Sequence, residues 1–258
     1  MVTKMAGVLF RSFIVRSSLI LQAGFSTIRY VEGVNAFSTA FTRGLPHGIA
    51  VAVHLPTSSD EIPEAVLHRL HADERMYAQE LNGKRRNEWV GGRLAARSAA
   101  RALGVELPAL LADNFGAPKA PKSISISIAH KEGLAVALIA RRANGIIGLD
   151  FETLGRDRRQ IAEKVLVPAE QAEVSALPDE RQWTAILLRF AIKEAIYKAL
   201  APRLRRYISF DEAEVSDLSN GSASVKLNLK GDMCPTHIEA RYDWMPEGLV
   251  TSVRVRWE

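Results

Sequence analysis

Two acidic residues close an apolar stretch near the middle of the chain. The segment Gly148–Glu152 has the sequence Gly-Leu-Asp-Phe-Glu. In a strand, residues i and i+2 point to the same face, so Asp150 and Glu152 present two carboxylates about 7 Å apart. Such a pair suits a hard divalent cation, above all Mg²⁺ shared with substrate phosphates. Two ordinary solvated acids at a strand end are the alternative interpretation.

A second group of charges lies in an otherwise apolar helical segment, 187–200. Its charged residues are Arg189, Lys193, Glu194 and Lys198. A helix that is apolar nearly all the way round is buried on most faces, so these charges need partners. Glu194 and Lys198 are spaced i, i+4 and share one side of the helix. A plain helical salt bridge between them, worth a few tenths of a kcal/mol, is the structural alternative.

Two further sets of residues could bind an anion. An alternating segment, Ser125–Ala129, is followed by His130, and a predicted long helix carries Arg85, Arg86 and Arg93. Guanidinium groups bind phosphate as a bidentate fork. A structural histidine and a solvated basic helix face are the alternatives.

The composition excludes several classes of protein. The chain has 258 residues, of which 47% are hydrophobic and 24% charged, as in an average globular protein, so collagen-like and extensively disordered chains are excluded. The one cysteine, Cys234, excludes a disulfide framework and multi-cysteine metal sites. The net charge is +5, but residues 1–48 carry +4 of it and leave +1 for the rest. A nucleic-acid-binding surface is therefore not expected.

We treat the first 48 residues separately from the rest of the chain because they carry most of its net positive charge. Their longest uncharged stretch, 17–28, has twelve residues, whereas a transmembrane helix needs about 20. Arginines interrupt the apolar part, which argues against a secretory signal. The composition fits an organellar transit segment or a start codon placed too early, and we otherwise expect a cytoplasmic protein.

The remaining sequence predicts an α+β fold with two related halves. We expect subdomains 49–144 and 145–258, meeting near Asn144-Gly145, after an N-terminal extension 1–48. A helix begins near Ser58-Ser59-Asp60, another covers 85–103, and the segment 160–202 is helical with a break at Pro178. The predicted strands are 49–55, 123–128, 134–140, 146–152, 223–229, 237–244 and 249–257.

Taken in order, these motifs resemble the 4'-phosphopantetheinyl transferases. The resemblance is to the monomeric, pseudo-duplicated type, nearest the bacterial branch that serves siderophore and other carrier-protein synthases. The pairing of GLDFE with KEAIYK about forty residues later is its most specific part. The matching segments are RRNEWVGGRLAAR (85–97), SISIAH (125–130), GLDFE (148–152), VPAEQ (167–171) and FAIKEAIYKAL (190–200).

The resemblance implies a fold, a reaction and a set of partners. Two pseudo-related α/β subdomains would form the active site between them. The enzyme, a monomer, would transfer the 4'-phosphopantetheinyl group of coenzyme A to a serine of an apo acyl or peptidyl carrier protein. The products would be holo carrier protein and 3',5'-ADP. The holo carrier protein would serve the synthesis of siderophores, non-ribosomal peptides, polyketides or fatty acids.

The resemblance also implies residue roles. Asp150, Glu152 and Glu194 would hold Mg²⁺ at the pyrophosphate of coenzyme A, and Glu152 and Glu194 are both candidates for the base that takes the serine proton. Lys198 would stabilise the leaving phosphate. The other implied coenzyme A ligands are Lys193, His130, Arg85 and Arg93.

Two departures from the family pattern affect the coenzyme A site. The family often has Ser or Thr before the histidine, where this chain has Ala129, and Ser127 is the nearest hydroxyl that could replace it. The loop before that strand has Phe115 and Ala120-Pro121 in place of a basic residue and a Trp-Pro pair, so Lys119 or Lys122 would supply the nucleotide contacts.

Two alternative functions stay open on the sequence. A catalytically weak homologue would bind coenzyme A or a carrier protein without transfer. A different Mg²⁺-dependent phosphotransferase or phosphohydrolase would use the three carboxylates alone and would release phosphate without a carrier protein.

Overall fold

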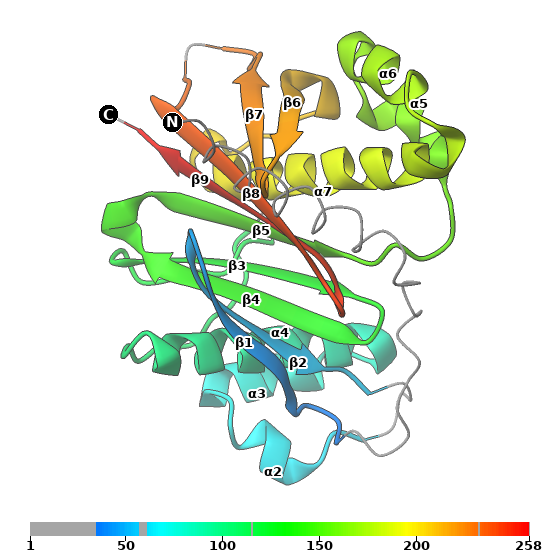
Figure 1. Cartoon of the computed structure of the whole chain (residues 1–258). Coiled ribbons are helices and arrows are strands. Elements are labelled where there is room, and N and C mark those ends of the chain that lie inside the picture. Colours follow the sequence, from blue (N-terminus) through cyan, green and yellow to red (C-terminus); the bar gives the residue numbers. More distant parts are fainter. Residues whose placement is uncertain (1–34, 57–60, 115, 232, 258) are drawn as a thin grey trace, which may run out of the picture. The chain divides into compact units, whose positions relative to one another are not determined.

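Two antiparallel sheets organise the chain. The structure is a computed structural model that describes residues 35–56, 61–114, 116–231 and 233–257 (Figure 1). The first sheet has the strand order β1-β2-β4-β3 and the second has the order β5-β9-β8-β7-β6. The first sheet contains β1 (Thr39–Leu45), β2 (Gly48–His54), β3 (Ile124–Lys131) and β4 (Leu134–Arg141), and the second contains β5 (Ile146–Glu152), β6 (Ala213–Ser219), β7 (Ser222–Leu227), β8 (His237–Met245) and β9 (Gly248–Arg256).

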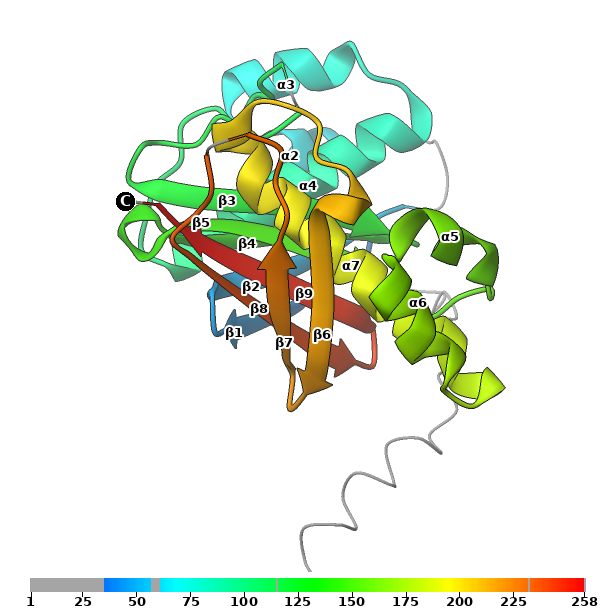
Figure 2. The same ribbon diagram turned by 90° about the horizontal axis from the view of Figure 1, so that it is seen from above.

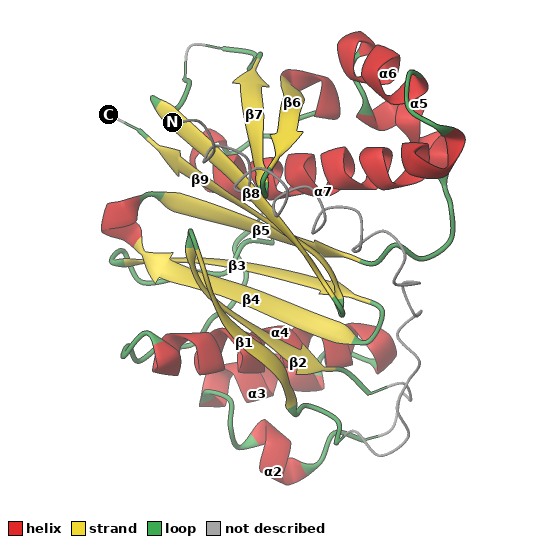
Figure 3. Ribbon diagram, viewed as in Figure 1, coloured by secondary structure: helices red, strands yellow, loops and turns green. Residues whose placement is uncertain are grey.

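Each sheet has one long helix (Figure 3). The long helices are α4 (Gly83–Ala102) and α7 (Asp179–Leu204), and the shorter ones are α2 (Glu64–Leu67), α3 (Ala72–Gln79), α5 (Ala162–Val165) and α6 (Pro168–Ser175). Within the described ranges, no helix is both long and apolar enough to cross a membrane.

The long helices cover the outer faces of the sheets, whose inner faces pack on each other (Figures 1 and 2). α4 contacts β2 and β4, and α7 contacts β5 and β9. Between the sheets lies a core that includes Leu138 from β4 and Ile147, Leu149 and Phe151 from β5. The described chain therefore has the layers helix, sheet, sheet, helix, which is an α+β fold.

Serine hydroxyls join the two sheets at their facing edges. The isoleucines of β3 enter the core under α4, so its alternate residues Ser125 and Ser127 point the other way. The Ile147 N–H donates to Ser125 Oγ at 3.0 Å, and the Leu149 N–H donates to Ser127 Oγ at 2.9 Å. β5 thus finds acceptors for edge N–H groups that no strand pairs on that side, and its register against β3 is fixed.

A buried glutamate fixes the first half of the fold. Glu74 is 0% exposed and closes a capping box at the start of α3, where its Oε2 accepts from the His71 N–H. The same oxygen accepts from Arg97 Nε on α4 at 2.8 Å, and Oε1 accepts from the Leu110 N–H. One carboxylate therefore ties α3, α4 and the following loop together.

The second half repeats this arrangement with other residues. Glu170 is 1% exposed and caps α6 by accepting from the Val167 N–H. Its Oε2 also accepts from Lys193 Nζ on α7 at 2.7 Å, and Oε1 accepts from the Val215 N–H of β6. A capping glutamate paired with a cation on the long helix is thus common to both halves.

Most predicted elements are present, but the structure adds α3, which was not predicted, and differs in three further respects. The first sheet begins with β1, before the predicted boundary at residue 49. The prediction missed this strand because residues 1–48 were set apart from the fold as a basic extension. β6 was not predicted, and α7 continues past Pro202 to Leu204. The predicted helix start at Ser58-Ser59-Asp60 and most of the extension 1–48 lie outside the described residues.

We expect Lys193→Met to destabilise the protein by about 3–5 kcal/mol, because it leaves the Glu170 carboxylate buried without its counter-charge. Urea unfolding measures the change, and Lys164→Met, at an exposed position of α5, controls for the loss of one positive charge. Wild-type stability in Lys193→Met would show that this buried pair does not hold α6 against α7.

We expect Ser127→Ala to cost about 1–2 kcal/mol, since the buried Leu149 N–H then has no acceptor. The matched control is Ser224→Ala at an exposed position of β7, which should stay within about 0.5 kcal/mol of the wild type. Equal unfolding midpoints for the two variants would contradict the role given to the hydroxyl.

Candidate active site

The glycine of the GLDFE segment lets β5 lie directly against α7. A Cβ atom added to Gly148 would lie 1.9 Å from the Ala195 carbonyl oxygen, so no larger residue fits. This close approach brings the end of β5 to the side of α7 that carries Lys198. The sequence motif therefore supplies both the carboxylates and the contact that positions them.

Asp150 and Lys198 form the centre of the site. Lys198 Nζ donates to Asp150 Oδ1 at 2.7 Å, and Asp150 is 6% exposed. The second carboxylate oxygen, Asp150 Oδ2, is buried without a hydrogen-bond partner among the described residues. An anionic oxygen in this state is a ready ligand for a cation.

Glu152 pairs with a lysine that was not among the predicted site residues. Its Oε2 lies 2.6 Å from Lys131 Nζ, at the end of β3. Burial raises the pKa of Glu152, and the Asp150 carboxylate adds to this, while the Lys131 ammonium opposes it. Where β3 lies beside β5, Lys131 of the first half therefore meets the Glu152 carboxylate of the second half.

Glu194 faces the same carboxylates from α7. Burial raises its pKa, the negative charges of Asp150 and Glu152 raise it further, and Lys198 opposes them. The helical salt bridge from Glu194 to Lys198 does not form, because Lys198 binds Asp150 instead. In the described part of the chain, no three His, Cys, Asp or Glu side chains are arranged as a metal site.

His130 lies at the border of this cluster. Its Nε2 is 3.1 Å from Glu88 Oε2 on α4. Burial lowers the pKa of His130, and the opposing effect of Glu88 is the largest of its charged neighbours, which include Lys198 and Asp150. The charges of Asp150 and Lys198 therefore act on the pKa of His130 as well as on each other.

A cleft of about 410 Å³ opens beside Lys198 between the two halves. Its basic lining residues are Lys119 from the loop before β3, Arg142 from the turn after β4, and Lys198. Ser125, Ser127 and Tyr197 line it as well. A concave site with three cations suits a ligand with several phosphates.

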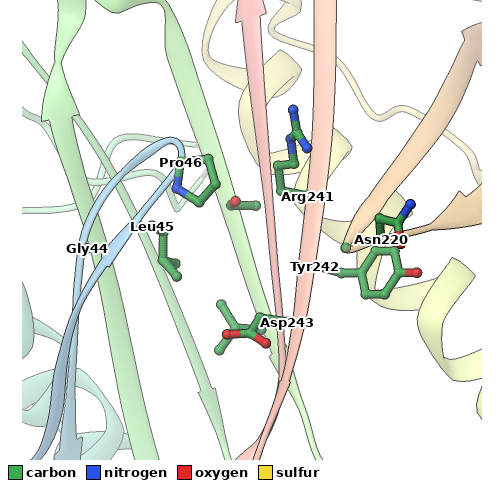
Figure 4. A pocket seen from close by; sticks show the side chains of 10 residues that line it. Gly44, Leu45, Pro46, Asn220, Arg241, Tyr242 and Asp243 are labelled. Carbon is green, nitrogen blue, oxygen red and sulfur yellow. The ribbon is translucent and has the colours of Figure 1, made fainter. Parts of the chain in front are cut away.

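A second pocket of about 440 Å³ lies away from these residues, between the β1–β2 turn and β8 (Figure 4). Its charges are already paired, because Arg241 donates to Glu239 at 2.7 Å and Asp243 lies 3.6 Å from Arg43. No predicted site residue lines it.

Two predicted coenzyme A ligands have structural partners. The Lys193 ammonium is buried and donates to Glu170 and to the carbonyl oxygens of Val165 and Phe210, so it has no free donor for a phosphate. Arg93 is also buried, with Nε bound to the Leu110 carbonyl and its guanidinium over Trp89. The resemblance assigned both residues to phosphate binding. All three donors of the Lys193 ammonium are used within the fold, whereas the contacts of Arg93 account only for its Nε and the face of its guanidinium.

The other predicted residues are differently placed. Arg85 is exposed near the start of α4. Ser127 lines the cleft while its oxygen accepts from Leu149. Phe115 lies outside the described residues, and Ala129 is buried.

Two site residues, Lys131 and Arg142, were missed by the sequence argument. Lys131 directly follows the predicted histidine, and Arg142 stands in a turn beside the predicted boundary of the halves. Neither has a spacing that marks it, since only the pairing of distant strands brings it to the site.

Two family models match this chain. The model of the 4'-phosphopantetheinyl transferase superfamily matches residues 146–253, and that of the 4'-phosphopantetheinyl transferase N-terminal domain matches residues 73–140. The solved holo-[acyl-carrier-protein] synthase of Thermotoga maritima is 25% identical, with a TM-score of 0.37, over 45% of this chain and 64% of that one.

Curated relatives match over longer stretches. The 4'-phosphopantetheinyl transferase of Mycobacterium tuberculosis is 33% identical over 52% of this chain and 59% of its own length. The enterobactin synthase component D of Salmonella austin is 27% identical over 67% of this chain and 74% of its own length. The 4'-phosphopantetheinyl transferase of Nocardia iowensis is 31% identical over 69% of this chain and 78% of its own length. With both halves matched in order and this share of a relative covered, the chain belongs to the 4'-phosphopantetheinyl transferase superfamily.

Proposed function

We propose that this protein transfers the 4'-phosphopantetheinyl group of coenzyme A to a serine hydroxyl of an acyl or peptidyl carrier protein. The observation that carries the proposal is the meeting of Asp150, Glu152, Glu194 and Lys198 beside a basic cleft between the two halves. Membership of the superfamily supports the same reaction.

The cleft beside Lys198 is the proposed binding site of coenzyme A. Lys119 and Arg142, which line the cleft, are the proposed ligands of the nucleotide phosphates, and Lys198, which donates to Asp150, is the proposed ligand of the pyrophosphate. His130 and the exposed Arg85 are the remaining candidates for phosphate contacts. We leave Lys193 out of this set because its three donors are bound within the fold, whereas Arg93, whose guanidinium lies over Trp89, stays a candidate.

Asp150 and Glu152 are the proposed ligands of a Mg²⁺ ion. The unpartnered Asp150 Oδ2 fits such an ion, and Mg²⁺ in phosphate-handling sites binds one or two carboxylates while the substrate phosphates and water complete its shell. Two ligands therefore suffice, without a group of three converging side chains. A bound Mg²⁺ would offset the negative charge that builds on the pyrophosphate oxygens during transfer.

The reaction exchanges a phosphoanhydride bond of coenzyme A for a phosphoester bond to the carrier serine. The serine oxygen forms a bond to the β-phosphorus of coenzyme A, and the bond from that phosphorus to the oxygen of the leaving 3',5'-ADP breaks. The Lys198 ammonium stabilises the charge that remains on the leaving phosphate. The electron pair of the broken bond leaves with the ADP oxygen.

Glu194 is the proposed acceptor of the serine proton. Of the three carboxylates, Asp150 and Glu152 are paired with lysines, whereas Glu194 has no ion pair within 4.0 Å in the described part of the chain. It can therefore take a proton without first breaking a salt bridge.

We expect an apo carrier protein incubated with this enzyme, coenzyme A and Mg²⁺ to gain the mass of one phosphopantetheinyl group, as measured by intact-mass spectrometry. Excess EDTA should abolish the gain, and added Mg²⁺ should restore it. Binding of coenzyme A without any gain on acyl and peptidyl carriers would favour a binding protein. Phosphate release without a carrier would favour a phosphohydrolase.

We expect Asp150→Asn to lower kcat for transfer at least about 100-fold, because it removes a charge at the pyrophosphate while keeping the side-chain shape. The control Asp243→Asn removes the same charge from β8, where the side chain is 50% exposed, and should keep wild-type turnover. Circular dichroism checks the fold of both variants. Unimpaired transfer by Asp150→Asn would refute the assignment of Asp150.

A further inference from the structure

We propose that Lys131 is an internal counter-cation of the carboxylate site, which competes with divalent metal for Glu152 when coenzyme A is absent. The inference rests on the proposed function, because it concerns the same metal ligands. The inference adds Lys131, a positioning residue from the first half of the fold, and it states in which order metal and coenzyme A bind. Metal would enter mainly together with the pyrophosphate, whose oxygens add ligands.

The backbone holds Lys131 in place opposite Glu152. Lys131 is the last residue of β3 and pairs with Leu134, the first residue of β4. The two turn residues between them, Glu132 and Gly133, have φ values of 39° and 82°, as in a tight type I′ hairpin. The start of this lysine side chain is thus fixed by two strands and a short turn, not by a flexible loop.

The contact is close and partly shielded from water. Lys131 Nζ lies 2.6 Å from Glu152 Oε2, with the Lys131 side chain 24% and the Glu152 side chain 9% exposed. Attraction between charges is stronger here than between fully exposed groups, which water and salt screen. A metal ion that binds Glu152 must first displace this ammonium or share the carboxylate with it.

Lys131 completes a charge balance that Lys198 begins. The carboxylates of Asp150, Glu152 and Glu194 lie near one another without a metal, and Lys198 pairs with Asp150 as Lys131 pairs with Glu152. Two lysines against three carboxylates leave a net charge of −1. A site this close to neutral attracts a divalent ion less than the bare carboxylates would.

The cavity next to Lys131 offers the displaced Lys131 ammonium another carboxylate. This cavity of about 350 Å³ is also lined by Glu88 and Glu132, from α4 and from the hairpin turn. Glu88 already pairs with His130 and Lys84, whereas Glu132 has no ion pair within 4.0 Å in the described part of the chain, so Glu132 is the proposed acceptor when a cation takes Glu152.

The test is a titration of the coenzyme A-free full chain with Mn²⁺, followed by the electron paramagnetic resonance signal of the unbound ion. We expect Lys131→Met to lower the dissociation constant about 3- to 10-fold relative to wild type, since it removes the competing charge. Lys131→Arg, which keeps that charge, and Lys226→Met, at an exposed position of β7, should stay within about twofold. In the Lys131→Met background, Asp150→Asn should abolish the tighter site.

An unchanged or larger dissociation constant in Lys131→Met would overturn the inference and leave the transferase proposal standing. Lys131→Gln is the second variant, with the same expected gain in affinity if the methionine variant does not fold. Binding of Mn²⁺ by neither the wild type nor the variants would contradict both the counter-cation and the metal ligands proposed above. Carrier-protein mass gain, measured separately on the wild type, reports on the transferase activity alone.

Discussion

The site depends on the register between two edge strands that form no backbone ladder with each other. Ser125 and Ser127 accept the N–H groups of Ile147 and Leu149, so side-chain oxygens stand where the carbonyls of a neighbouring strand would be. Because the two contacts advance by two residues on both strands, β3 and β5 run in the same direction and end at the same level. This is why the last residues of β3, with their basic side chains, meet the last residues of β5, with their carboxylates. A slip by one residue would turn the serines into the core and would separate the charges.

The buried pair of Lys193 and Glu170 sets the rotation of α7 about its axis. Successive helical residues are about 100° apart, so Glu194 and Lys198 project about 40° from each other while Lys193 and Lys198 differ by about 140°. With Lys193 fixed against α6, the neighbouring positions Glu194 and Lys198 turn toward β5. The first lysine of the segment KEAIYK, Lys193, thus binds Glu170 within the fold, and the second, Lys198, binds Asp150. The corresponding pair in the first half, Arg97 with Glu74, fixes α4 in the same way.

The sequence predicts local features well and partners poorly, for reasons visible in single residues. The alternation of Ser and Ile in β3 and the apolar run of β5 predict both strands and the common face of Asp150 and Glu152. The structural contacts of Lys193 and Arg93 were not predicted, because residue type does not show which face of a helix another element covers. Their partners, Glu170 and the Leu110 carbonyl, are distant in sequence. β1 was missed because Arg43 was counted with the basic extension, although it lies in a strand paired with β2.

Lysines solve a general problem of sites that gather carboxylates for a metal. Without the metal, acidic groups brought together in a partly buried place repel one another, and each then carries a raised pKa or needs a cation. Here burial and mutual repulsion raise the pKa of Glu152 and Glu194, while Lys131 and Lys198 supply positive charge from separate elements. A lysine suits this role better than an arginine, because its compact ammonium on a flexible stem can leave one carboxylate for another without losing a planar, bidentate geometry. The two lysines therefore offset the repulsion between the carboxylates in the metal-free fold, and in the proposed transferase they would give way to the substrate and its cation.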